Sequence, residues 1–83
     1  MLERVTVLAD EDGEFSDWIE LLNPEPGTVN LAGWFLTDNV LIPQKWQFPA
    51  TSLSPGGRMI VFASGKDRRS PGAELHTNFR LDS

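Results

Sequence analysis

The chain has 83 residues, enough for one small domain, with 40% hydrophobic and 23% charged residues and no cysteine. The absence of cysteine excludes disulfide bonds and a thiolate zinc site. A net charge of −5, with only seven Lys and Arg, argues against general affinity for nucleic acid. No apolar stretch approaches the ~20 residues of a membrane-spanning helix, and the N-terminus lacks the basic-then-apolar pattern of a signal peptide.

The pattern along the chain predicts an all-β domain. No window keeps apolar residues at helical spacing, and six prolines and seven glycines interrupt the chain. Short alternating or β-branched runs lie between turn signals instead, which is typical of a sandwich or barrel. In chain order, the runs expected to form strands are residues 4–8, 17–22, 33–38, 45–48, 58–64 and 75–81.

Side-chain alternation assigns the residues of these strands to faces. In DWIELL (17–22), Ile19 and Leu21 share one face, while Glu20 lies on the other. The two carboxylates of this run therefore do not converge as a catalytic pair would. In LHTNFRL (75–81), alternation puts His76 on a polar outer face. Since His76 is the only histidine, and neither a cysteine nor an identified serine nucleophile accompanies it, no catalytic triad is predicted.

The acidic turn after residue 9 is the best candidate for a metal site. Hard cations such as Ca²⁺ prefer several carboxylate oxygens on a loop, although the spacing here is not that of an EF-hand. The alternative is an ordinary solvated turn. The residues concerned are Asp10, Glu11, Asp12, Glu14 and Asp17.

The densest basic group is Lys66, Arg68 and Arg69, in the loop GKDRRSPG. It is interpreted either as a solvated loop or as a contact for an acidic ligand, shared with His76.

Several motifs occur in the order and spacing of a known family. They are WIEL-x-N at 18–23, L-x-G-W-x-L at 31–36, W-x-F-P at 46–49, L-x-P-G at 53–56 and V-x-A-S-G at 61–65. Together they resemble the lamin-tail domain family, and its bacterial members above all. The resemblance implies an immunoglobulin-like β-sandwich without a catalytic centre or cofactor, spanning residues 1–83 as one domain. It also implies a core position for Trp34 and an inward face formed by Met59, Val61 and Ala63.

The sequence departs from that family at both ends. Residues 1–8 are expected to form a divergent first strand, and the resemblance implies about two further strands beyond Ser83 that this sequence does not contain. We therefore expect an incomplete sandwich that is completed by oligomerisation, since open strand edges invite pairing with another chain. Ile60 and Phe62, on the outer face of their strand, would then form an uncovered apolar patch.

Two functions remain open at this stage. The first is a non-catalytic binding or anchoring module that uses outer aromatic residues, Trp18 or Trp46, to contact a protein partner. The second is a self-assembling structural element that joins copies through its open edges. Members of the family suggest an exported or cell-surface location.

Overall fold

The computed structural model describes residues 8–81, so the predicted strand at 4–8 lies almost entirely outside the described residues. The described chain contains seven strands and no helix, which confirms the all-β prediction. The two longest strands have nearly the predicted bounds, whereas the others are much shorter. The strands are β1 (Asp17–Leu22), β2 (Val29–Asn30), β3 (Phe35–Leu36), β4 (Trp46–Gln47), β5 (Ser52–Leu53), β6 (Arg58–Ala63) and β7 (Leu75–His76).

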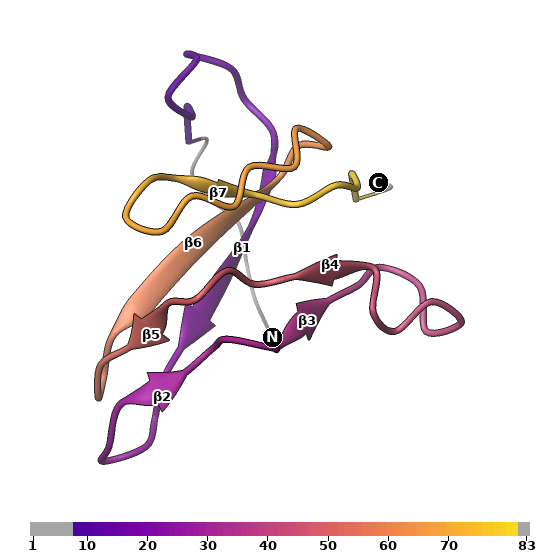
Figure 1. Cartoon of the computed structure of the whole chain (residues 1–83). Helices are drawn as coiled ribbons and strands as arrows, with labels where there is room; N and C mark the ends of the chain where they lie inside the picture. Colours follow the sequence, from indigo (N-terminus) through magenta and orange to yellow (C-terminus); the bar gives the residue numbers. More distant parts are fainter. Residues whose placement is uncertain (1–7, 82–83) are drawn as a thin grey trace.

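One layer of the domain is a three-stranded sheet in the order β1-β6-β7 (Figure 1). Strands β1 and β6 pair antiparallel along their full length, with Trp18 opposite Phe62. Strand β7 joins β6 in parallel, with Phe62 opposite His76. Strands β1 and β6 are the longest because their β-branched and aromatic residues suit a pleated sheet that is covered on one face.

The second layer is a two-stranded antiparallel ribbon formed by residues 29–53. Strands β2 and β3 run along one side of the ribbon, and β5 and β4 run along the other. Backbone bonds from Leu31 to Thr51 (2.8 Å) and from Phe48 to Trp34 (2.9 Å) connect the two short pairings in between. Figure 1 shows the ribbon crossing the sheet, with the β3–β4 loop extending beyond it.

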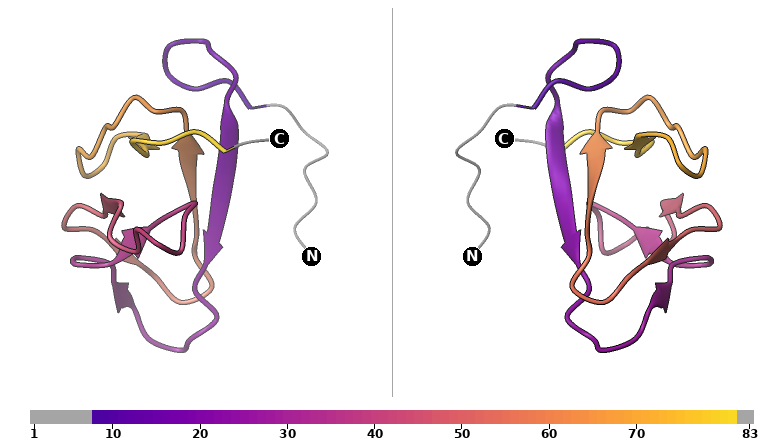
Figure 2. Two further views of the ribbon diagram at one scale, coloured as in Figure 1. Left: turned by 90° about the vertical axis from the view of Figure 1, so that its right-hand side faces the viewer. Right: turned by 90° about the vertical axis from the view of Figure 1, so that its left-hand side faces the viewer.

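The core lies between these two layers. Figure 2 shows the two layers facing each other. The ribbon contributes the larger buried side chains, among them Trp46 and Phe48, and strand β6 contributes the smaller Val61 and Ala63. The inward face predicted for β6 is confirmed, because Val61 and Ala63 are buried and Met59 packs against them. The buried members of the core are Leu31, Trp46, Phe48, Leu53, Val61, Ala63, Leu75 and Phe79.

Two of the three tryptophans lie where the sequence analysis did not expect them. Trp34, assigned to the core, has 52% of its surface exposed. Trp46, considered as a surface contact, is only 2% exposed; it packs edge-on to Phe48 and donates its indole N–H to Asp67. The prediction failed because β3 and β4 pair for only two residues each, so alternation over the longer expected strands does not hold. Trp18 is half-buried on the outer face of β1.

The prediction of an uncovered apolar patch on β6 is wrong for Phe62. Its side chain points to the outer face, but it is only 5% exposed and stacks on the ring of His76 with 5.2 Å between centroids. Ile60, on the same face, is half-buried. No helix in the described part of the chain is long and apolar enough to cross a membrane.

Candidate functional site

The acidic turn is a tight loop organised by Asp10. An antiparallel bridge between Ala9 and Phe15 closes it. The Asp10 carboxylate is fully buried, and its Oδ1 accepts the backbone N–H groups of Asp12 (2.9 Å) and Glu14 (3.0 Å). This is the side-chain-to-backbone bonding that Asp provides in turns. Residues 10–14 are called the acidic loop below.

Lys66 reaches into the acidic loop from the far end of the sequence. Its Nζ lies 2.6 Å from Asp10 Oδ2, 2.9 Å from Asp12 Oδ2 and 2.6 Å from Glu14 Oε1. The hydrogen bond from Lys66 lowers the pKa of Asp10 to about 2, helped by the backbone donors and opposed by burial. In return, the three carboxylates, Asp10 first, raise the pKa of Lys66.

Arg68 adds a second cation at the outer side of the same loop. Its guanidinium lies 2.8 Å from Asp12 Oδ2 and 3.3 Å from Glu11 Oε2. Hydrogen bonds from Arg68, then from Lys66, lower the pKa of Asp12. Arg69 instead pairs with its neighbour Asp67 at 3.4 Å. The basic loop that the sequence offered to an acidic ligand is thus largely occupied by acids of the same chain.

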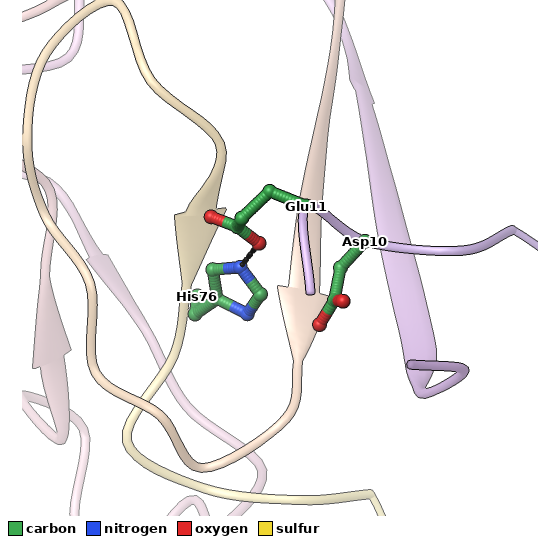
Figure 3. Close-up of side chains that lie close together, drawn as sticks. All are labelled: Asp10, Glu11 and His76. Atoms are coloured by element: carbon green, nitrogen blue, oxygen red, sulfur yellow. Dashed lines mark hydrogen bonds and ion pairs between the residues drawn. The ribbon is translucent and has the colours of Figure 1, made fainter. Parts of the chain in front are cut away.

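His76 joins the acidic loop to the sheet (Figure 3). Its Nε2 lies 2.5 Å from Glu11 Oε1, and its Nδ1 lies 2.7 Å from Ser64 Oγ. Ser64 Oγ already accepts the backbone N–H of Lys66, so its own proton is free to be donated to Nδ1. In this arrangement Nε2–H donates to Glu11. His76 shares the outer face of the sheet with Phe62, as alternation predicted, but this face is covered there, and its side chain is fully buried between Ser64 and Glu11.

The order serine, histidine, glutamate along this hydrogen-bonded chain is that of a hydrolytic triad. Ser64 is the serine that the sequence analysis did not connect with His76. Both Ser64 and His76 are buried, however, and Ser64 Oγ is bonded on two sides. A nucleophile must be reachable by the substrate carbon, which this oxygen is not. The arrangement therefore fastens the acidic loop to β6 and β7. We call the acidic loop with Ser64, Lys66, Arg68 and His76 the clamp.

Two groups within the clamp have metal-ligand chemistry. In each of them, Asp10, Glu11 and His76 or Asp10, Asp12 and Glu14, one ligand atom per residue lies within 4.8 Å of the others. The second group contains three of the residues predicted for calcium and lacks Glu11 and Asp17; Asp17 lies at the start of β1, opposite Ala63. The Lys66 ammonium contacts all three of its carboxylates. A Ca²⁺ ion needs six to eight oxygens and would have to displace that ammonium. The calcium site stays a prediction, and this geometry argues against it.

The most exposed apolar side chains lie in the β3–β4 loop, at the end of the ribbon. Val40 is 89% exposed and Leu41 86%, with Ile42 beside them; these three residues are called the apolar tip. The loop is held by its own polar groups. Thr37 Oγ1 lies within hydrogen-bond distance of the carbonyl oxygens of Asn39 and Ile42, and it can donate its one proton to either of them. Asn39 Oδ1 accepts the backbone N–H of Leu41.

A second apolar feature is a pocket of about 180 Å³ at the opposite end of the ribbon. Asn23 shapes it, since its side-chain amide donates to the carbonyls of Gly27 and Leu53 and its Oδ1 accepts the N–H of Glu25. Trp34 lines this pocket, which accounts for its partial exposure. The lining residues are Leu21, Leu22, Asn23, Pro24, Glu25, Val29, Leu31, Trp34 and Leu53.

The sequence analysis missed both apolar features. A signal for the tip was available, because NVLIP places three consecutive apolar residues between turn-forming Asn39 and Pro43, where a loop is normally polar. The pocket had no such signal, since its lining residues are spread between positions 21 and 53 and come from several separate parts of the chain.

A two-layer β domain with a clamped loop and an exposed apolar hairpin belongs to the class of small β-sandwich domains. The family model of the lamin tail domain matches residues 5–83. The chain therefore belongs to the lamin tail domain family, which is immunoglobulin-like, as the sequence motifs predicted. Searches of curated proteins and of solved structures each returned no match.

Proposed function

We propose that this domain is a non-catalytic module that binds a protein partner through the apolar tip. The observation that carries the proposal is the near-complete exposure of Val40 and Leu41 at the end of the ribbon. Exposed apolar side chains gathered at one place are typical of contact surfaces in proteins that otherwise bury such residues. Membership of an interaction-domain family supports the same function.

The tip is suited to binding because its backbone is already ordered. The Thr37 and Asn39 hydrogen bonds hold the loop, and the Asp38–Lys45 ion pair (2.8 Å) joins its two ends. A loop held in one conformation loses less entropy on binding than a free one.

The clamp is less suited to this role, although it contains most of the residues that the sequence first suggested. Lys66, Arg68 and His76 are each bonded to carboxylates of the same chain. An external acidic ligand would have to replace these bonds at a desolvation cost.

Self-assembly through open edges stays an untested prediction. The cover that His76 gives to Phe62 removes one of the two observations that supported it. Light scattering after size exclusion, over a range of concentrations, tests it directly.

The proposed function is tested by site-specific photo-crosslinking in the source cells. A photo-reactive phenylalanine analogue replaces Leu41 in one variant and Glu74, an exposed residue of the β6–β7 loop, in the control. We expect a discrete crosslinked protein from position 41 that is absent from position 74. Adding Val40→Asp should abolish it, because a charge in an apolar contact is left desolvated.

Equal crosslinking from both positions, or crosslinking that survives Val40→Asp, would overturn the proposal. Circular dichroism of each variant shows whether the fold is intact. Both positions are exposed, so their substitution should leave the stability almost unchanged.

A further inference from the structure

The pocket at the β2–β5 end of the ribbon combines an apolar lining with an acidic rim. Leu21, Val29, Leu31 and Leu53 contribute aliphatic surface, and Trp34 adds a half-exposed ring. Glu25 also lines it, and its carboxylate makes no ion pair with any group among residues 8–81.

The pocket is formed before any ligand binds. The hydrogen bonds of Asn23 fix the loop of residues 23–27 against β5, and backbone bonds in both directions fix Asn23 to the turn at Gly56 and Gly57. Asn23 is itself buried, so these bonds are shielded from water. Because the pocket walls are already ordered, binding a ligand does not require the free energy that ordering a loop would cost.

The size of the pocket limits what can fill it. At about 180 Å³, it is below the range of roughly 300–1,000 Å³ that is usual for cofactor and small-molecule sites. It is comparable to a cavity of about 150 Å³, which accommodates one benzene ring. One aliphatic or aromatic side chain therefore matches it best.

The charge limits the neighbour of that side chain. The chain carries a net charge of −5, and Glu25, an exposed residue of the pocket lining, has no ion-pair partner among the described residues 8–81. A cation beside the inserted group would gain the attraction of Glu25, and it would also be favoured near the Trp34 ring.

We propose that this pocket binds a partner polypeptide by one inserted apolar side chain that is adjacent in sequence to a Lys or Arg. The contact lies at the end of the ribbon opposite the apolar tip and does not depend on it. The pocket gives the domain sequence selectivity, since apolar surface alone discriminates poorly between side chains.

The test uses the whole 83-residue chain as bait for a display library of random 12-residue peptides. Enriched peptides are synthesised, and their affinity is measured by fluorescence anisotropy. We expect a shared pair of one large apolar residue beside Lys or Arg. In ¹⁵N–¹H spectra, the peptide should shift the indole signal of Trp34 and the backbone amide signals of Leu22, Asn23 and Glu25.

Variants then separate the contributions. Trp34→Ala should weaken peptide binding by about tenfold or more, because it removes an aromatic wall. Glu25→Lys should weaken it by roughly fivefold and reduce its salt dependence, as expected for a rim ion pair. The matched control, Glu74→Lys in the exposed β6–β7 loop, should bind as the parent does.

Several results would overturn the proposal: no enriched peptide, peptides without the basic residue, or shifts located at the apolar tip. Concentration-dependent self-association that shifts the pocket signals would assign the pocket to a second copy instead. Loss of crosslinking at Leu41 bears only on the tip, so the two proposals fail independently.

Discussion

The clamp and the ribbon differ in whether their most conspicuous side chains have partners within the chain or remain exposed to water. In the clamp, Lys66 and Arg68 are satisfied by carboxylates from the far end of the chain. In the ribbon, Trp34 and Leu41 have much of their apolar surface left in water. The charged residues of the clamp are conspicuous in the sequence, but they pair with other residues of the same chain. The exposed apolar surface that a partner could contact lies on the ribbon.

The difference follows from what each region has to do in a small domain. A chain of this size buries only a modest share of its surface, so its stability margin is thin. The core between the two layers contains no residue of the acidic loop, which precedes β1. The clamp instead holds this loop to β6 and β7. The ribbon supplies the largest core side chains from its middle and therefore tolerates apolar residues at its two ends.

The sharpest contrast between core and surface is offered by two tryptophans of the ribbon. Trp46→Ala should lower the free energy of unfolding by about 3–5 kcal/mol, because a fully buried ring leaves a cavity and its N–H bond to Asp67 is lost. Trp34→Ala should cost well under half as much. Urea unfolding monitored by circular dichroism measures both. Equal losses would contradict the assignment of Trp34 to the surface.

The buried hydrogen bonds of the clamp can be tested at Ser64. Ser64→Ala should cost about 1–3 kcal/mol, since it leaves buried His76 Nδ1 without a partner. Ser52→Ala in β5, an exposed position, should change the stability by less than about 0.5 kcal/mol. If thermal unfolding shows no difference between the two variants, the hydrogen bond between Ser64 and His76 does not contribute as described.

The electrostatic part of the clamp should appear in acid. The pKa of Asp10 is lowered from 3.8 to about 2 in the folded state, chiefly by Lys66. Its contribution is therefore complete above pH 4 and is lost as the pH falls through about 2. Asp10→Asn should reduce proton uptake on unfolding between pH 2 and 4 by up to about one proton. The slope of unfolding free energy against pH measures this uptake.

Glu74→Gln, in an exposed loop, is the control for this titration and should keep the parent slope. Some slope should persist in Asp10→Asn, because hydrogen bonds from basic groups also lower the pKa of Asp12 and Asp38. An unchanged slope in Asp10→Asn would show that Lys66 does not stabilise Asp10 in solution.

The smallest effect on stability is expected at the apolar tip. Leu41→Ser should change the free energy of unfolding by less than about 0.5 kcal/mol, because the side chain is exposed. Thermal unfolding provides the measurement. A loss comparable to that of Ser64→Ala would mean that the tip packs against the domain and is not available to a partner.

The sequence predicted the fold class and the long strands well. Strands β1 and β6 combine alternation with β-branched residues over six positions, enough to determine both bounds and faces. The short strands of the ribbon were harder to predict, because a strand of two paired residues is too short to show an alternating pattern. For this reason the exposure of Trp34 and the burial of Trp46 were not predicted. The burial of His76 was not predicted for another reason. Alternation assigned its side chain to the correct face of the sheet, but the acidic loop covers that face.

Local pattern thus determined what depends on neighbours in sequence: an all-β chain, its turns, and the inward face of Met59, Val61 and Ala63. The family motifs added the immunoglobulin-like class. Tertiary structure alone decided which charges would meet, because Asp10 and Lys66 are 56 positions apart in the chain. It also decided where a pocket would form, since the pocket lining comes from stretches that only the packing of the two layers brings together.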